Sequence, residues 1–199
     1  MITRMTDEYH SDLRHLTWDE VYERQRARSE YVSRWFDDAG LGRGATVVEL
    51  GSGPGYVAVR AARRVGPSGV VYAIDRQRDA LCVLQRVARE AAIENVAPIL
   101  ADAEVLPVAF ARPVTALLTY VLHHTDRPDR LLAALDRALP SGSRLFVCEY
   151  HPEGSGDVGP PLAHRIGASQ LRSWLDAAGF DVDRAVEYEN ESYGFVARC

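Results

Sequence analysis

The sequence predicts an α/β fold in which a doubly wound, mostly parallel, seven-stranded sheet ends in an antiparallel hairpin. Apolar stretches of strand length alternate with segments of helical periodicity along the chain, which is typical of a parallel sheet covered on both faces. The first strand-like stretch leads into a glycine-rich loop, "GSGPG", at 51–55. The last two stretches, "DVDRAVEY" and "SYGFVARC", flank the turn residues "ENE", which indicates a hairpin.

Five strands and five helices are expected before that hairpin. Pro98 places the third strand near an edge or at a strand start, because proline cannot donate a hydrogen bond to a neighbouring strand. The segment 151–167 contains four glycines and three prolines, and a loop of this length is often functional. The expected strands are 45–50, 69–75, 96–102, 114–122 and 144–150, and the expected helices are 18–38, 57–65, 78–93, 128–139 and 169–180.

Length, charge and cysteine placement indicate which classes of protein the chain can belong to. The length of 199 residues predicts one domain over 1–199. A net charge of −5 argues against nucleic-acid binding, for which a basic surface is expected. Cys82, Cys148 and Cys199 are scattered without metal-ligand spacing, so we expect neither a disulfide framework nor a metal site. No apolar run has the length of a membrane span, and the first residues lack a signal-peptide pattern, so we expect a cytoplasmic protein.

The glycine-rich loop lies where open α/β sheets bind ligands, beyond the carboxyl end of a strand. A dinucleotide-binding loop would need a third glycine at the position that Tyr56 occupies. Pro54 removes one backbone N–H group and so weakens the loop as an anion site. A P-loop is excluded because no Gly-Lys-Ser/Thr sequence follows. The loop is therefore rich in glycine without being suited to phosphate.

Acidic residues end three successive strands of the predicted sheet: Glu49, Asp75 and Asp102. Glu49 would repel a pyrophosphate but suits a ligand with an amino group and a sulfonium. Asp75 is placed to accept hydrogen bonds from both hydroxyl groups of a ribose, although it also fits an N-cap of the helix near Arg78. Asp102 is placed near an adenine amino group, or it forms a turn. Together the three acids indicate a nucleoside ligand that carries positive charge.

Four motifs resemble the successive motifs of class I S-adenosylmethionine-dependent methyltransferases, which have a Rossmann-like fold. They are "VVELGSGPG", "VVYAIDRQ", "LADAEVLPV" and "LTYVLHHTDRP", and the similarity covers about residues 18–199. The chain is most similar to the branch that methylates small molecules and includes quinone-ring methyltransferases. The resemblance implies S-adenosylmethionine as cofactor, S-adenosylhomocysteine as product, and residues 1–40 as a helical cap over the cofactor site.

The resemblance also assigns roles to single residues. The loop glycines and Glu49 would line the methionine part of the cofactor, Asp75 would bind the ribose, and Asp102 would face the adenine. The first helix would supply one contact, for which Tyr22 is our choice. The full set of cofactor-binding residues implied is Tyr22, Glu49, Gly51, Gly53, Gly55, Asp75, Arg76, Asp102, Ala103 and Tyr120.

The acceptor side of the site is less clearly marked. His123 and His124 follow the fourth strand, where a histidine could act as a general base, or the pair packs against loop backbone without doing chemistry. Glu149, Tyr150 and His151 end the fifth strand and are our candidates for substrate contacts.

The expected function is methyl transfer by in-line displacement to a small-molecule acceptor, with a homodimer as an option. The alternative is a cofactor-binding sensor or assembly protein without transferase activity, and an acceptor-sized cavity beside the cofactor would distinguish the two. An NAD-linked dehydrogenase is weakened by Tyr56. An arsenite methyltransferase is disfavoured because the cysteines are not placed to converge.

Overall fold

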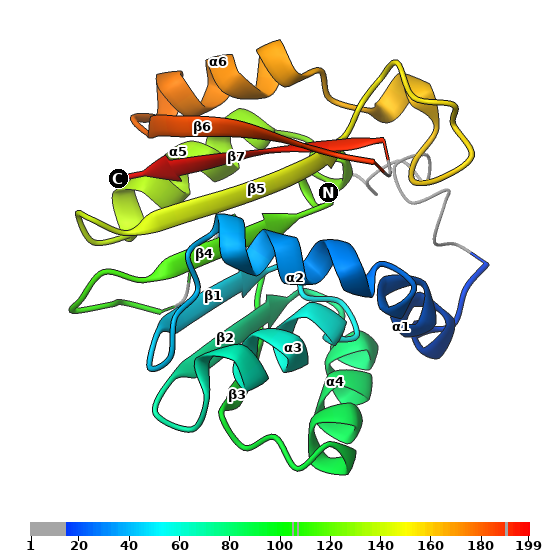
Figure 1. The fold of residues 1–199 in the computed structure, drawn as a ribbon, viewed down its shortest axis with the longest axis vertical. Coiled ribbons are helices and arrows are strands. Elements are labelled where there is room, and N and C mark those ends of the chain that lie inside the picture. Colours follow the sequence, from blue (N-terminus) through cyan, green and yellow to red (C-terminus); the bar gives the residue numbers. More distant parts are fainter. Residues whose placement is uncertain (1–14, 105, 107, 190) are drawn as a thin grey trace, which may run out of the picture.

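The computed structural model describes residues 15–104, 106, 108–189 and 191–199. Its centre is a seven-stranded sheet in the order β3-β2-β1-β4-β5-β7-β6, shown in Figure 1. All neighbouring strands up to β5 are parallel, and β7 pairs antiparallel with both β5 and β6. The predicted fold class is therefore confirmed. The strands are β1 (Thr46–Leu50), β2 (Val70–Asp75), β3 (Val96–Leu100), β4 (Thr115–Thr119), β5 (Arg144–Tyr150), β6 (Asp181–Tyr188) and β7 (Ser192–Arg198).

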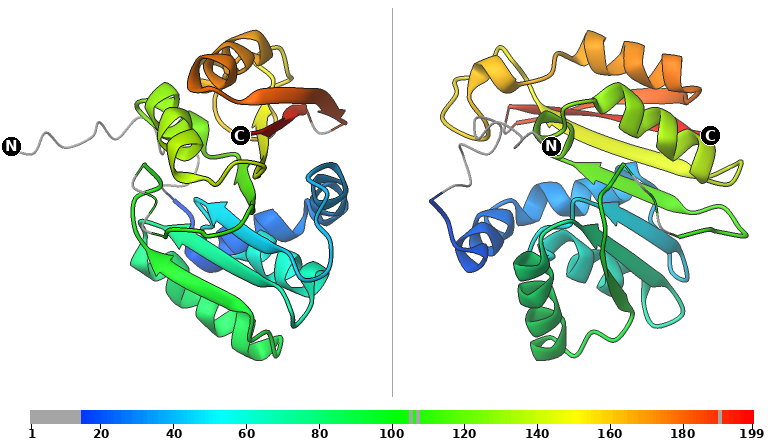
Figure 2. Two further views of the ribbon diagram at one scale, coloured as in Figure 1. Left: turned by 90° about the vertical axis from the view of Figure 1, so that its left-hand side faces the viewer. Right: turned by 180° about the vertical axis from the view of Figure 1, so that it is seen from behind.

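Helices cover both faces of the sheet (Figure 2). Successive strand residues point to opposite faces, so Val47 joins the apolar cluster beneath α2, α3 and α4, whereas Val48 joins the cluster beneath α5 and α6. Among the described residues, no helix combines the length and apolar character that crossing a membrane requires. The helices are α1 (Trp18–Arg26), α2 (Ser29–Asp38), α3 (Tyr56–Val65), α4 (Arg78–Glu90), α5 (Pro128–Ala138) and α6 (Ala168–Ala178).

The expected helix 18–38 is two helices in the structure. A capping box starts α1, in which the Thr17 hydroxyl accepts from the backbone N–H of Glu20 and the Glu20 carboxylate accepts from that of Thr17. The first helix ends at Arg26 with Ala27 as its C-cap, and Arg28 leaves the helical backbone conformation before α2 begins. The break lets α2 bury Val32, Trp35 and Phe36 in the core while α1 contacts α3 and α4.

The third and fourth strands are shorter than predicted. Their predicted ranges were 96–102 and 114–122, but β3 ends at Leu100 and β4 at Thr119. Tyr120 ends the regular strand because its φ of +58° lies in the left-handed region. A single turn of 3-10 helix, η1 (Leu122–His124), follows. The edge position predicted from Pro98 is confirmed, since β3 is the outermost strand.

Candidate functional site

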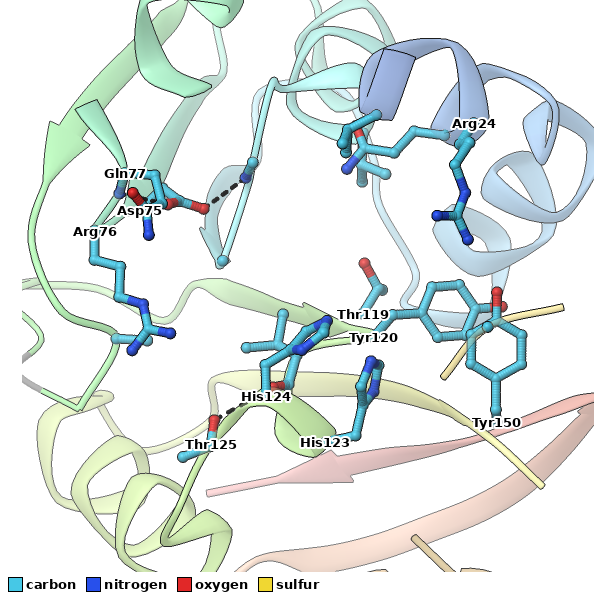
Figure 3. Close-up of a pocket in the computed structure, with 18 of the residues that line it drawn as sticks. Arg24, Asp75, Arg76, Gln77, Thr119, Tyr120, His123, His124, Thr125 and Tyr150 are labelled. Atoms are coloured by element: carbon cyan, nitrogen blue, oxygen red, sulfur yellow. Dashed lines mark hydrogen bonds between the residues drawn. The ribbon is translucent and has the colours of Figure 1, made fainter. Parts of the chain in front are cut away.

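A cavity of about 580 Å³ opens at the carboxyl ends of the parallel strands, under α1 and the start of α2. Figure 3 shows its labelled side chains converging from several elements. One end of the cavity is formed by the residues after β2 and β3, and the other by the ends of β4 and β5 together with α1. The described residues that line it are Leu16, Trp18, Val21, Arg24, Gln25, Arg28, Val32, Trp35, Gly51, Gly53, Val57, Asp75, Arg76, Gln77, Asp102, Ala103, Glu104, Thr119, Tyr120, Val121, His123, His124, Thr125, Asp126, Leu131, Tyr150 and Gly159.

The glycine-rich loop packs closely against neighbouring segments, which explains why two of its positions require glycine. Gly51 has a φ of +68°, and a Cβ there would come within 2.6 Å of the Val121 side chain. Gly55 has a φ of +86° and caps the start of α3, and a Cβ there would overlap the Leu84 side chain of α4. Both positions therefore exclude a side chain by space as well as by backbone conformation.

Asp75 ties the end of β2 to that loop. Its Oδ2 atom accepts a hydrogen bond of 2.7 Å from the Gly53 backbone, and its Oδ1 atom accepts one of 2.8 Å from Gln77. Burial raises the pKa of the Asp75 carboxyl, and the backbone N–H groups of Gln77 and Gly53 partly offset that rise. Asp75 does not cap α4 as the alternative interpretation suggested, because the N-cap position is Gln77.

Glu49 lies directly before the loop and is only 2% exposed. Its Oε2 atom is buried and has no hydrogen-bond partner among the described residues. Burial, and to a lesser degree the charge of Asp75, raises the pKa of Glu49 well above its ordinary value. A buried carboxyl without a partner is costly to charge, so a positively charged ligand nearby would be favoured by this residue.

His123 and Glu149 form a buried pair beside the cavity. The Nδ1 atom of His123 lies 2.6 Å from the Glu149 Oε2 atom, and Oε1 accepts a hydrogen bond of 2.8 Å from the backbone of Leu122. The two side chains are 2% and 1% exposed. Since a carboxylate at Nδ1 favours the tautomer protonated there, the Nε2 atom is the nitrogen left to accept a proton. The ring of His124 is 4.0 Å from that of His123.

Two stacked tyrosines and an arginine form the far end of the cavity. The rings of Tyr120 and Tyr150 lie 4.3 Å apart and nearly parallel. The guanidinium carbon of Arg28 lies 4.8 Å from the centre of the Tyr120 ring and 5.7 Å from that of Tyr150. The Tyr120 hydroxyl is also 3.0 Å from the Ser192 hydroxyl. Arg28 is thereby held where β4 and β5 end.

The structure brings most of the predicted site residues together but leaves five outside the cavity lining. Tyr22 packs its ring against Tyr56, with ring centres 5.5 Å apart, because it lies on the side of α1 that faces α3. Glu149 lies behind His123, and His151 pairs with Glu187 at 2.6 Å. The predicted residues that line the cavity are Gly51, Gly53, Asp75, Arg76, Asp102, Ala103, Tyr120, His123, His124 and Tyr150, and those that do not are Tyr22, Glu49, Gly55, Glu149 and His151.

The first helix contributes residues that the sequence analysis missed. Val21, Arg24 and Gln25 all line the cavity, and their spacing of three and four places them on one face of α1. Arg28, in the break between α1 and α2, lines the cavity as well. Gln25 also accepts a hydrogen bond of 3.2 Å from the backbone of Tyr56, at the start of α3. The helical spacing of Val21, Arg24 and Gln25 in the sequence could have predicted this face of the helix. The sequence analysis instead chose Tyr22, which lies on a different face.

Two relatives match part of the chain. The protein named ubiquinone/menaquinone biosynthesis C-methyltransferase UbiE from Pasteurella multocida (strain Pm70) is 30% identical over 115 residues, 57% of this chain and 43% of that protein. A probable cobalt-precorrin-6B C(15)-methyltransferase (decarboxylating) from Sulfurisphaera tokodaii is 29% identical over 104 residues, 52% of this chain and 53% of that protein. The chain thus spans about half the length of these curated relatives.

Solved structures share the fold. A SAM-dependent methyltransferase from Aquifex aeolicus has a TM-score of 0.78 at 24% identity, covering 83% of this chain and 88% of that one. The [4+2]-cyclase SpnF has a TM-score of 0.74 at 20% identity, covering 87% and 82%. A family model described as a methyltransferase domain matches residues 41–185. Because this match takes in most of the chain, the predicted family is confirmed: the chain belongs to the methyltransferase-domain family.

Proposed function

We propose that the protein transfers a methyl group from S-adenosylmethionine to a small-molecule acceptor, with S-adenosylhomocysteine as the second product. The observation that carries the proposal is the buried Oε2 atom of Glu49, which lacks a hydrogen-bond partner among the described residues. Glu49 lies two residues before Gly51 of the glycine-rich loop, behind the residues that line the cavity. S-adenosylmethionine has a sulfonium and an amino group, so its charge complements this acid. A pyrophosphate would bring further negative charge to a carboxyl that is already costly to charge, which disfavours a dinucleotide.

The remaining cofactor contacts would come from the end of the cavity near β2 and β3, where Asp75 and Asp102 lie. Asp75 would accept hydrogen bonds from the ribose in addition to those from the loop and Gln77, because each carboxylate oxygen has more than one lone pair. Arg76 would lie beside the adenine ring, and Asp102 with the Ala103 backbone along its edge. The backbone of Gly51 and of Gly53 would face the methionine part. Helices α1 and α2 would act as the cap that residues 1–40 were expected to form.

When bound, S-adenosylmethionine supplies a methyl group whose bond to sulfur breaks as its bond to the acceptor forms, with the electron pair left on sulfur. The protein's main task is to orient the acceptor and exclude water. His123 would take the proton of the acceptor nucleophile on Nε2, while Glu149 holds its Nδ1–H group. In this role Glu149 is a positioning residue, and the substrate contact predicted for it is replaced by its bond to His123.

The alternative of a cofactor-binding protein without transferase activity is not favoured. A filled or closed acceptor cavity would support it, but the cavity continues from Asp102, past the glycine-rich loop, to Tyr150. Space for a second molecule thus adjoins the residues assigned to the cofactor. This arrangement supports a reaction between two bound molecules.

Isothermal titration with S-adenosylmethionine, S-adenosylhomocysteine and NAD tests the proposal. We expect micromolar binding of both adenosyl compounds and none of NAD, with at least a tenfold loss in an Asp75→Ala variant, since hydrogen bonds to a charged group contribute about 1.5–3 kcal/mol. Asp79→Ala, in the exposed first turn of α4, is the matched control and should bind as the wild type does. Preferential binding of NAD, or no adenosyl binding, would contradict the proposal.

A further inference from the structure

The cavity has opposite charges at its two ends. Asp75, Asp102 and Glu104 line the end near β2 and β3 together with one arginine, Arg76, so that end keeps an excess of carboxylates, whereas Arg24 and Arg28 line the end under α1. Arg24 lies on α1, and Arg28 lies in the break between α1 and α2. Figure 3 shows Arg24 reaching from α1 toward the hydroxyl groups of Tyr120 and Tyr150. The basic end thus combines two guanidinium groups with two phenols.

Arg28 is held by aromatic rings rather than by a carboxylate. Its contacts are with the faces of Tyr120 and Tyr150, and no ion pair of Arg28 occurs in the part of the chain that the structure describes. The side chain is only partly exposed. Cation–π contacts leave the N–H groups at the edge of a guanidinium able to bind an anion.

Both arginines act on the hydroxyl of Tyr150. Burial raises the pKa of Tyr150, and the positive charges of Arg28 and, to a smaller extent, Arg24 oppose that rise. Arg28 lies against the Tyr150 ring, and Figure 3 shows Arg24 pointing toward the Tyr150 hydroxyl, so both cations lie near one part of the cavity wall. An anion bound there would meet two guanidinium groups and a phenol donor, which is a favourable set for a carboxylate.

The position of this basic end places it on the acceptor side. Asp75 ends β2 and Tyr150 ends β5, and β1 and β4 lie between those strands. Three strand spacings put the two ends roughly 14 Å apart. His123 lies beside the basic end, with its ring centre 6.5 Å from that of Tyr150. A molecule held at Arg28 would therefore present its remaining groups to His123.

We propose that Arg28 and Arg24 bind a carboxylate of the methyl acceptor, so that the acceptor is a small aromatic carboxylic acid methylated at a second group near His123. The inference rests on the proposed function. The aromatic character follows from the walls beside Arg28, where Trp35 meets Tyr120 with ring centres 5.4 Å apart. With the carboxylate held by the arginines, the nucleophile that loses its proton to His123 is a hydroxyl, amine or activated carbon elsewhere on the ring.

The test uses matched probes on protein saturated with S-adenosylhomocysteine. 4-Hydroxybenzoate and benzoate are titrated beside 4-hydroxybenzamide and benzamide, which keep the ring and lose the charge. We expect the acids to bind at least tenfold more tightly than the amides, and Arg28→Gln to abolish that preference. Arg28→Lys, which keeps the charge without the planar fork, should retain part of it. Arg26→Gln removes an exposed arginine of α1 that pairs with Glu23 and should leave the preference intact.

The outcomes separate this inference from the proposed function. If the wild type fails to bind S-adenosylhomocysteine, the proposed function fails, whatever the probes do. If it binds S-adenosylhomocysteine but binds acids and amides equally, only the present inference is overturned. A second overturning result is that Arg28→Gln weakens S-adenosylhomocysteine but not 5′-methylthioadenosine, because the arginine would then hold the carboxylate of the cofactor. Unchanged thermal unfolding of each variant confirms that it is folded.

Discussion

The two ends of the cavity are built in different ways. The end near β1 and β2 is made by a short loop and by carboxylates that directly follow strands, so that Asp75 bonds to Gly53 only 22 positions away. The end near β4 and β5 joins distant segments: Arg28 precedes the sheet, Tyr120 follows its fourth strand and Tyr150 ends its fifth. The comparison indicates that a cofactor site can be encoded in local motifs, whereas an acceptor site depends on how distant side chains meet.

A large loss of stability is expected at the cofactor end, where Gly55 cannot hold a side chain. Gly55→Ala combines a left-handed φ of +86° with an overlap with Leu84, and we expect a loss of about 2–5 kcal/mol in the free energy of unfolding. Gly42→Ala is the control, since nothing lies within 4 Å of a Cβ there. Urea denaturation measures both. Equal stability of the two variants would contradict the packing role of Gly55.

At the acceptor end, two histidine–glutamate pairs with the same 2.6 Å separation differ in burial. Glu149→Ala leaves the Nδ1–H group of His123 and the backbone N–H of Leu122 buried without an acceptor, and should cost about 2–6 kcal/mol of unfolding free energy. Glu187→Ala breaks the pair with His151, whose carboxylate partner is 67% exposed, and should cost about 0–1 kcal/mol. Chemical denaturation of both variants tests the difference.

A more conservative substitution of Glu149 tests its role in positioning His123 separately from its effect on stability. Glu149→Gln keeps the side-chain shape, but its uncharged amide no longer favours one tautomer of His123. Nitrogen NMR of labelled histidine should show His123 as a single tautomer protonated at Nδ1 in the wild type, and as a mixture in the variant. The resonance is assigned by its loss in His123→Asn. A single, unchanged tautomer in Glu149→Gln would refute the positioning role.

The same contrast explains what the sequence analysis could predict. The mostly parallel sheet, the closing hairpin, the edge position of β3 and the acids at the strand ends were accessible, because each leaves a pattern within a short stretch of sequence. The helix break at Arg28 was not accessible because no glycine or proline marks it in the sequence. The bond from Glu149 to His123 was not accessible because it joins a side chain of β5 to the turn after β4, and no sequence pattern pairs these two residues. Tyr22 was chosen by family resemblance, while the helical face that begins at Val21 carries the lining residues.

The protonation state of Glu49 offers a further test of the cofactor end. Its pKa is raised in the folded protein, so its contribution to stability is present below its ordinary pKa of 4.5 and is lost as the pH rises through the folded value. In the Glu49→Gln variant, the free energy of unfolding should therefore decrease less as the pH rises. A bound sulfonium would favour the charged carboxylate, so S-adenosylmethionine should release more protons on binding than S-adenosylhomocysteine. Titrations in buffers of different ionisation enthalpy measure this, and Glu49→Gln should remove the difference.

The smallest effect is expected in the loop that borders the acceptor end. The buried guanidinium of Arg165 bonds to the carbonyls of Pro160 and His151 and to the Glu191 carboxylate. The hydrogen bonds from Ser155 and Arg165 lower the pKa of Glu191 to about 2. The stabilisation is therefore fully present above the ordinary carboxyl pKa of 4.5 and is lost as the pH falls from there through the folded value of about 2.

Glu191→Gln should accordingly loosen the 151–167 segment without unfolding the sheet. We expect limited proteolysis to cut the variant faster than the wild type within this segment at neutral pH, and the difference to shrink as the medium becomes acidic, because protonation weakens the wild-type contacts as well. Glu189→Gln, a nearby exposed carboxylate on the turn after β6, controls for the loss of charge.

Since Gly159 of this segment lines the cavity beside Tyr150, a bound aromatic acid should slow the cleavage, and S-adenosylhomocysteine alone should slow it less. Equal protection by both would mean that the segment responds to the cofactor end, and the division of the cavity into two independently built ends would then be wrong.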